Sequence, residues 1–305
     1  MNWGFRTILT LAVALSALPS SRAAVFYVNA FLGDDAYNGQ SATFISGTIG
    51  PKKTIHAAMQ LMAADDTLYL AKGNYPESVK VNQGQVWETA DTVWVKALYM
   101  QASGSELVLQ GSMMYVRDSL QLDAGLITVR NGFVFATKEY ANVNIGNDSS
   151  YVNGRYFLEN SNPFIGNLIF PIGRDNSYRP VVMNILQSTY DLNRYGFELK
   201  VGPAPSGSLP ATLGKLSDVH HLEFSSFGLA DPYDVVAYMA YDTAGLDDEV
   251  FDIDSVHVAF LPSGSSVYKD LHGLGTAPLK GNISNSTAAD TTGIFVLATA
   301  PHGLN

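Results

Sequence analysis

The sequence contains no cysteine among its 305 residues. Disulfide bonds, thiolate metal sites and cysteine nucleophiles are therefore excluded. Charge is also scarce, because only 15% of the residues are charged, and 18 Lys and Arg stand against 28 Asp and Glu. The formal charge of −10 repels phosphate backbones and anionic lipid surfaces, so the composition argues against nucleic acid as a partner.

Common catalytic motifs and long apolar runs are missing as well. The chain has no Gly-x-Ser-x-Gly, no phosphate-binding loop and no His-Glu-x-x-His. No stretch after the N-terminal region is long and apolar enough for a transmembrane segment, and helical periodicity is absent from the second half. A hydrophobic fraction of 47% still suffices for two domains with their own cores, which argues against disorder.

The first 23 residues have the features of a signal peptide. Arg6 supplies positive charge, residues 7–18 form an apolar run, and Ser21 and Ala23 place small residues where a cleavage site needs them. An apolar run of this length is too short to span a bilayer of roughly 30 Å. The sequence therefore predicts a signal peptide over residues 1–23 and a secreted, extracellular or cell-surface product.

Residues 54–75 change from a helical period to a strand period. Residues 55–62 predict a short amphipathic helix, whose apolar stripe must be covered by other apolar groups. Leu68 and Leu70 then alternate with their neighbours at a period of 2. We therefore expect a helix that caps the first rung of a stacked β-structure. The apolar stripe of this helix comprises Ile55, Ala58, Met59 and Met62.

Residues 92–145 consist of short alternating runs separated by Gly, Asn, Asp or Ser. Each run is too short to bury its apolar face alone and must stack on the next one, which is typical of a β-solenoid. At about 20 residues or more per coil, about five coils fit into residues 24–150 once the capping segment is allowed for. The aliphatic side chains expected to stack inward are Leu107, Leu109, Leu120, Leu122, Ile127 and Val129.

Two stretches at the N-terminal end carry a resemblance to a known superfamily. Residues 26–39 and 51–81 read FYVNAFLGDDAYNG and PKKTIHAAMQLMAADDTLYLAKGNYPESVKV. They resemble the amino-terminal cap and first coil of right-handed parallel β-helix proteins of the pectate-lyase-like superfamily. The resemblance implies a parallel β-helix domain over residues 24–150. It implies no particular activity, because that superfamily includes lyases, hydrolases and adhesins.

The alternating runs become longer after residue 147, beyond a segment punctuated by Pro and Gly. Their spacing predicts an antiparallel β-sandwich domain over residues 151–305. The predicted fold is therefore all-β, with a short right-handed parallel β-helix and its N-terminal capping helix followed by a β-sandwich. The runs lie at residues 179–185, 195–201, 221–227, 235–241, 256–261 and 293–298.

Three short stretches of the second half carry another resemblance, namely SYVNG at residues 150–154, FPIG at 170–173 and YRPV at 178–181. They resemble β-sandwich modules of surface-exposed or secreted proteins that Gram-negative bacteria export by type IX secretion. The resemblance implies a bacterial, adhesin-like protein of the cell surface. Such proteins usually carry a separate C-terminal sorting domain. Since the sequence shows none, we expect either a fragment of a longer protein or a different route of export.

Asp34, Asp35 and Asn38 are the candidate metal ligands. Their hard oxygens lie close together in one loop and suit calcium, the only cofactor that the sequence suggests. Asp and Asn ahead of a turn more often accept hydrogen bonds from nearby backbone amides, and no bidentate Glu follows at a fixed offset. His220 and His221 are a poor metal pair, because neighbouring residues of a strand point to opposite faces. The acidic run over residues 247–254 matches no calcium loop.

Trp87 and Trp94 are the candidate glycan-contact residues, because tryptophan offers a flat apolar ring with a polar edge. Core packing is the alternative role for at least one of them. No catalytic residue is assigned. The sequence therefore predicts a non-catalytic scaffold for adhesion or for contact with an extracellular polysaccharide or cell-surface glycan.

The alternative is a polysaccharide lyase that acts on acidic glycans. Such an enzyme needs a base to remove a proton next to a carboxylate and a cation to neutralise that carboxylate. The basic residues of the predicted coils are scattered along the sequence, and a solvated strand charge is the commoner role. These residues are Lys96, Arg117, Arg130 and Lys138.

Overall fold

The computed structural model describes most of the chain after residue 22. The predicted signal peptide lies outside the described residues except for Ala23, and so does the acidic run at 247–254. Among the described residues, no helix combines the length and the apolar character that crossing a membrane requires. The described ranges are 23–160, 166–187, 193–227, 233–242, 256–275 and 280–301.

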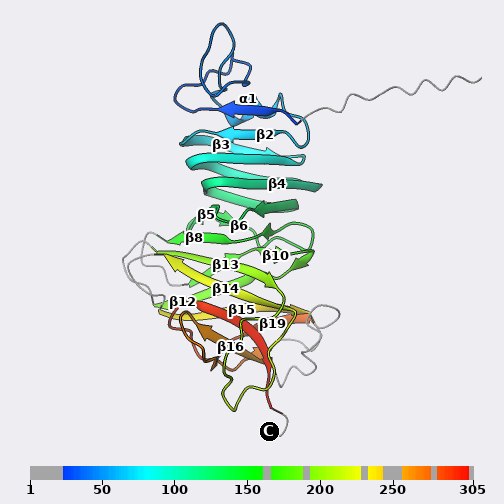
Figure 1. Ribbon diagram of the computed structural model, residues 1–305, viewed down its shortest axis with the longest axis vertical. Coiled ribbons are helices and arrows are strands. Elements are labelled where there is room, and N and C mark those ends of the chain that lie inside the picture. The colour runs from blue at the N-terminus through cyan, green and yellow to red at the C-terminus, as the bar shows by residue number, and fades with distance from the viewer. Residues whose placement is uncertain are drawn as a thin grey trace, which may run out of the picture.

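The N-terminal half is a β-solenoid of about 5 turns. Its coils are stacked along the long axis of the molecule, with an N-terminal loop at one end and the antiparallel strands at the other (Figure 1). Every pairing between successive coils is parallel. The strands of these coils are β1 (Val25–Val28), β2 (Thr67–Leu70), β3 (Gly73–Val81), β4 (Gln85–Val129), β5 (Val134–Lys138) and β8 (Tyr156–Asn160).

Three short strands extend the parallel pairing on another side of the coils. β6 (Asn142–Val143) and β7 (Val152–Asn153) pair with β4, and β10 (Ile172–Arg174) pairs with β7. β11 (Ser177–Tyr178) then turns back on β10 as an antiparallel partner. Parallel pairing thus continues beyond residue 150, and the domain boundary expected there stays a prediction.

The coils have a regular length where β4, β5 and β8 meet. Tyr115 pairs with Ala136, and Ala136 pairs with Phe157, so one coil returns to the same position after 21 residues. Gly111 turns one of the corners with a φ of +102°, and a Cβ there would lie 2.2 Å from the carbonyl oxygen of Thr89. The inward aliphatic rows are confirmed, because Leu107, Leu109, Leu120, Leu122, Ile127 and Val129 are all buried.

Helix α1 (Ile55–Met59) is shorter than the apolar stripe predicted for it. Thr54 caps its N-terminus by accepting a hydrogen bond from the Ala57 amide, and Ile55 and Ala58 are buried. Beyond Met59 the amides bond three residues back, as Met62 does to Met59, so the chain tightens into turns. Met62 is buried although it lies outside the helix, which means that the stripe predicted burial better than it predicted regular helix.

The C-terminal half begins where parallel pairing gives way to antiparallel pairing. β13 (Asn193–Val201) pairs antiparallel with β8, and β14 (His220–Phe227) pairs antiparallel with β13. This sheet continues through β20 (Gly293–Thr299), β16 (Val256–Pro262) and β17 (Lys269–Asp270). A separate sheet contains β18 (Leu274–Gly275), β19 (Lys280–Ser284), β15 (Tyr233–Asp242), β12 (Val181–Gln187) and β9 (Gly166–Phe170).

The predicted strands of the second half are confirmed, since each of the six alternating runs corresponds to one of β12, β13, β14, β15, β16 and β20. The two sheets contact each other through aromatic and aliphatic side chains. Phe170 of β9 packs edge-on against Phe197 of β13 with ring centroids 4.9 Å apart. One hydrophobic cluster runs through both halves, from Phe26 in β1 to Leu297 in β20.

Candidate functional site

A row of side chains crosses the outside of the solenoid, opposite to its core. Trp94, Tyr115, Ala136 and Phe157 follow one another at the coil length of 21 residues. The rings of Trp94 and Tyr115 are stacked, with centroids 4.1 Å apart and planes 9° from parallel. Tyr115, Ala136 and Phe157 form a small hydrophobic cluster of their own, against which Trp94 packs. We call these four residues the outer aromatic row.

Trp94 is the accessible end of the outer aromatic row. Tyr115 is only 3% exposed, whereas Trp94 is half-buried. On the neighbouring coil, the residue in register with Trp94 is Asn74, which is exposed. Because the short amide of Asn74 cannot cover an indole ring, part of Trp94 remains open to solvent. A flat aromatic surface with polar neighbours is what a sugar ring needs for stacking.

A second row, made of cations, runs beside the aromatic one. Lys96, Arg117 and Lys138 each follow a member of the outer aromatic row by two residues, and they therefore share its face of the strands. Lys96 is exposed, and the Arg117 Nε is buried without a hydrogen-bond partner among the described residues. The Lys138 Nζ lies 5.3 Å from the centroid of the Trp94 ring.

The sequence analysis treated these cations as scattered, and the solenoid brings three of them together. The signal that could have found the row is the spacing of 21 residues between Lys96, Arg117 and Lys138, which matches the spacing between Trp94 and Tyr115. Arg130 does not join them, because it lies at the exposed turn after β4.

A buried carboxylate lies at the end of the cationic row, where the two halves of the chain meet. Glu159 of β8 forms ion pairs with Lys138 and with Arg194 of β13, the latter at 3.0 Å. Arg194 also donates a hydrogen bond to the Tyr115 hydroxyl. Burial acts to raise the pKa of Glu159, but hydrogen bonds from Lys138, Tyr115 and Arg194 outweigh it and hold the pKa below its usual value. Lys138 is therefore committed to Glu159, whereas Lys96 and Arg117 remain available.

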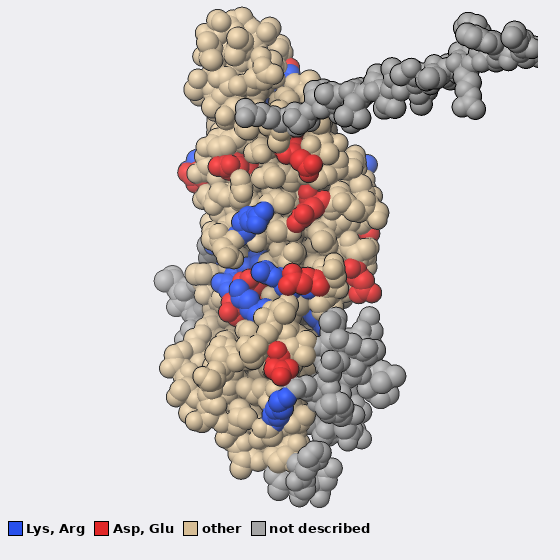
Figure 2. Space-filling model, turned by 45° about the vertical axis from the view of Figure 1, so that its right-hand side comes forward, with Lys and Arg blue, Asp and Glu red and all other residues tan. Residues whose placement is uncertain are grey.

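Another group of ion pairs lies next to Glu159 on the antiparallel strands. Arg155 bridges Glu198 at 3.0 Å and Glu223 at 2.5 Å, and Lys200 contacts Glu198 at 2.7 Å. Figure 2 shows basic and acidic side chains gathered on this face at the level where the coils meet the antiparallel strands. The adjoining groove has a volume of about 410 Å³, and three of its charged groups, Arg155, Glu198 and Lys200, already pair with one another. This group joins the two halves and leaves little free charge for a ligand.

The loop with the candidate calcium ligands uses the same oxygens for hydrogen bonds within the protein. Asp34 accepts from the Ala36 amide, and Asn38 accepts from the Gln40 amide. Asp35 accepts from the Lys53 and Thr54 amides and from the Thr54 hydroxyl, which fixes the loop to the start of α1. The contacts of Asp34 and Asn38 are the Asx-turn contacts of the alternative interpretation, whereas Asp35 bonds to residues 18 and 19 positions further along the chain. A calcium site at Asp34, Asp35 and Asn38 stays a prediction.

Trp87, the other candidate glycan-contact residue, lies in the core. Its side chain has no exposed surface, and its indole N–H donates a hydrogen bond to the buried side chain of Gln85. A sugar cannot reach it in this structure. Trp87 and Trp94 both lie in β4 at positions of opposite parity, so the strand directs them to opposite faces.

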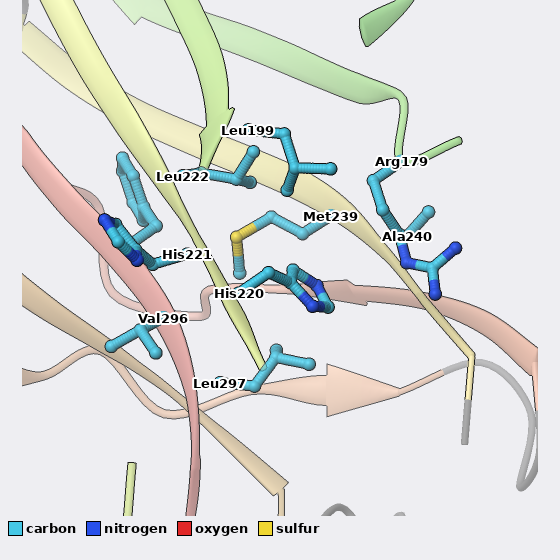
Figure 3. A pocket seen from close by; sticks show the side chains of 10 residues that line it. Arg179, Leu199, His220, His221, Leu222, Met239, Ala240, Val296 and Leu297 are labelled. Carbon is cyan, nitrogen blue, oxygen red and sulfur yellow. The ribbon is translucent and has the colours of Figure 1, made fainter. Parts of the chain in front are cut away.

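The side chains of His220 and His221 adjoin a small cavity between the two sheets of the C-terminal half. In Figure 3 the two imidazoles point in different directions, as expected for neighbours on a strand. The cavity has a volume of about 10 Å³ and is lined mainly by apolar residues such as Leu199 and Met239. That is room for about one water molecule, so this cavity is no ligand site.

The stability of the protein should fall in mild acid because of His220. Burial, together with the charges of Arg179 and His221, lowers the pKa of His220 from 6.5 to about 4. The unfolded chain therefore binds a proton that the folded chain resists, so the stabilisation is complete above pH 6.5 and is lost as the pH falls toward 4. We expect a loss of roughly 3 kcal/mol across this window.

Urea unfolding between pH 7.5 and pH 4 checks this effect. The variant His220→Gln should show a flatter dependence on pH than the wild type, because the titrating group is gone. His56→Gln serves as the control for the loss of an imidazole at an exposed position. Parallel curves for the wild type and His220→Gln would refute the assignment to His220.

Comparisons of the chain with protein families, with curated proteins and with solved structures found no match. The solenoid with little helix is consistent with the expected parallel β-helix, while the pectate-lyase-like and type IX resemblances gain no support from the comparisons. Any function must therefore be argued from the geometry of the chain itself.

Proposed function

We propose that this chain is a secreted or cell-surface, non-catalytic protein that contacts a glycan with the outer face of its solenoid. The observation that carries the proposal is the stack of Trp94 on Tyr115, half-open to solvent and placed beside a row of cations. Tyr115 holds the indole in one orientation before any ligand arrives. A rigid aromatic surface loses little conformational entropy on binding, which favours affinity.

The charges near Trp94 favour an acidic glycan over a neutral one. Among the described residues, no carboxylate pairs with Lys96 or Arg117, although the chain as a whole is acidic. Asp91, three residues before Trp94, already forms an ion pair with Lys72 at 3.1 Å. A sugar ring stacked on Trp94 could therefore direct its carboxylate to Lys96 or Arg117, where a charge-assisted hydrogen bond would hold it.

The architecture around the site supports the role of a scaffold. We propose that the solenoid is right-handed and that α1 caps it, since the buried Ile55 and Ala58 belong to the same core as the first coils. We propose likewise that the C-terminal half is a β-sandwich, because side chains of its two sheets share one core. Export by a signal peptide, and by type IX secretion in a bacterium, completes this proposal.

A polysaccharide lyase acting on acidic glycans is the second candidate function. The row formed by Lys96, Arg117 and Lys138 favours it, because such an enzyme needs cations around a uronic acid. Lys138 is engaged by Glu159, so Lys96 and Arg117 would have to supply both the base and the carboxylate-binding cation. Incubating the chain with acidic polysaccharides and following ultraviolet absorbance tests for the unsaturated product. Its appearance would replace the non-catalytic proposal with this one.

Trp94→Ala should weaken binding to acidic oligosaccharides by about tenfold or more, equivalent to about 1.4 kcal/mol, because the stacking surface is lost. A glycan array first identifies the best ligand, and calorimetric titration then compares the variants. Lys96→Ala and Arg117→Ala should each reduce binding and its dependence on salt. Trp94→Phe is the matched control, since a smaller ring retains part of the stacking. Unchanged affinity in Trp94→Ala would remove the outer aromatic row as the binding site.

A further inference from the structure

Three potential metal ligands converge at the edge strand β17, remote in sequence from the outer aromatic row. His257 comes from β16, Asp270 ends β17, and His272 follows two residues later. The His257 Nδ1 lies 3.0 Å from a carboxylate oxygen of Asp270, and the His272 Nδ1 lies 3.5 Å from the same oxygen. One ligand atom from each residue lies within 4.8 Å of the other two.

The backbone fixes each of these side chains. β16 and β17 pair antiparallel with Ala259 opposite Asp270, which places His257 diagonally across from the carboxylate. The carbonyl oxygen of His272 accepts a hydrogen bond from the Val258 amide, and the amide of His272 donates to Asp270. The group is thus held by the ends of two strands rather than by a free loop.

Asp270 is further oriented by its surroundings. Its side chain is only 6% exposed, whereas that of His272 is 55% exposed. A side-chain hydrogen bond from Thr212 also favours the ionised carboxylate. A hydrogen-bonded carboxylate, two imidazoles and one open side form the arrangement that a metal ion with a bound water requires.

We propose that His257, Asp270 and His272 bind a divalent transition-metal ion of the zinc type. Zinc lies about 2.0–2.1 Å from nitrogen and oxygen ligands, so neighbouring ligands of a tetrahedral ion are roughly 3.3 Å apart. The two distances of 3.0 and 3.5 Å lie on either side of that value. Two imidazoles with one carboxylate suit zinc, cobalt or nickel, whereas calcium and magnesium take oxygen ligands.

This site is independent of glycan contact, because it uses other residues on another part of the sheet. The alternative is that Asp270 only accepts hydrogen bonds from the two imidazoles. The two cases differ in one measurable respect. A carboxylate that only accepts hydrogen bonds needs no metal. The proposed site instead has a saturable affinity for Zn²⁺ or Co²⁺ that depends on both histidines.

The test is a titration of the full chain with Zn²⁺ or Co²⁺ after treatment with a chelator and its removal. We expect one ion per chain to saturate the site, with Co²⁺ giving the visible absorption of a tetrahedral complex. His257→Asn and His272→Asn should each lower the affinity about tenfold or more. Asn suits position 272 because His272 has a φ of +54°, a conformation that Asn tolerates, so the variant should fold.

His56→Asn is the matched control, because the His56 Nδ1 also lies against a carboxylate, 2.9 Å from Glu77, but no second imidazole joins them among the described residues. It should leave metal binding unchanged, and thermal melts establish that all the variants fold. Absence of saturable binding, or equal affinity in His272→Asn and the wild type, would overturn the proposal. Competition by Ca²⁺ at similar concentration would also contradict it.

Discussion

Replacing Glu159 with alanine should lower the free energy of unfolding by about 3–5 kcal/mol. The carboxylate is only 5% exposed and holds Lys138 of the solenoid together with Arg194 of the antiparallel sheet. Without it, two partly buried cations repel each other, and neither can return to water without moving the strands. The Tyr115 hydroxyl would lose a neighbour as well. Urea unfolding followed by fluorescence measures the loss.

Glu223→Ala is the comparison that isolates burial as the cause. The side chain of Glu223 is 34% exposed, and its partners Arg155 and Lys200 both retain Glu198. We expect that variant to lose at most about 1 kcal/mol, as exposed ion pairs do. A similar loss in Glu159→Ala and Glu223→Ala would show that the buried group at Glu159 has no special role in joining the two halves.

Trp87→Ala should cost about 3–5 kcal/mol of stability, because truncating a fully buried tryptophan leaves a large cavity in a close-packed core. Trp87 is in register with Leu68 of β2. Its truncation would therefore weaken the packing between two of the first coils. The side chain of Gln85 would also lose the indole N–H that it accepts, and an unsatisfied buried acceptor costs about 1–3 kcal/mol. Thermal and urea unfolding measure the effect.

Trp94→Ala provides the internal comparison, since both tryptophans lie in β4. Trp94 is half-buried, and its loss removes one stacked aromatic pair worth about 0.5–1.5 kcal/mol. We therefore expect Trp87→Ala to change stability and Trp94→Ala to change binding. Binding that fails in Trp87→Ala while the fold persists would contradict this division of roles between the two tryptophans.

Much of the fold could be predicted from local patterns. The aliphatic pairs Leu107 with Leu109 and Leu120 with Leu122 predicted inward rows, and they are buried. Alternation alone shows that such pairs share a face, and short runs with closely spaced turns imply stacking. The alternation around Trp94 also indicated that its side chain points outward, because its neighbours Val93 and Val95 point inward. It was hard to interpret there, since tryptophan is plausible both in a core and on a surface.

The candidate sites could be predicted only in part. Trp94 was chosen from the sequence, but its partner Tyr115 and the row of Lys96 and Arg117 depend on the coil length. That length is known only when the register between strands is known, because a shift of one residue would place these side chains in the core. No local motif links His257 to His272, which are joined through the pairing of two strands.

The sequence by itself determined which stretches form strands and which aliphatic side chains face inward, because these properties follow from residue type and a period of 2. Only the tertiary structure decided which strands become neighbours. Coil stacking placed Trp94 on Tyr115, and the change from parallel to antiparallel pairing placed Arg194 beside Glu159. Both contacts join residues at least one coil apart, and their free energy depends on burial and register, which arise when the chain has folded.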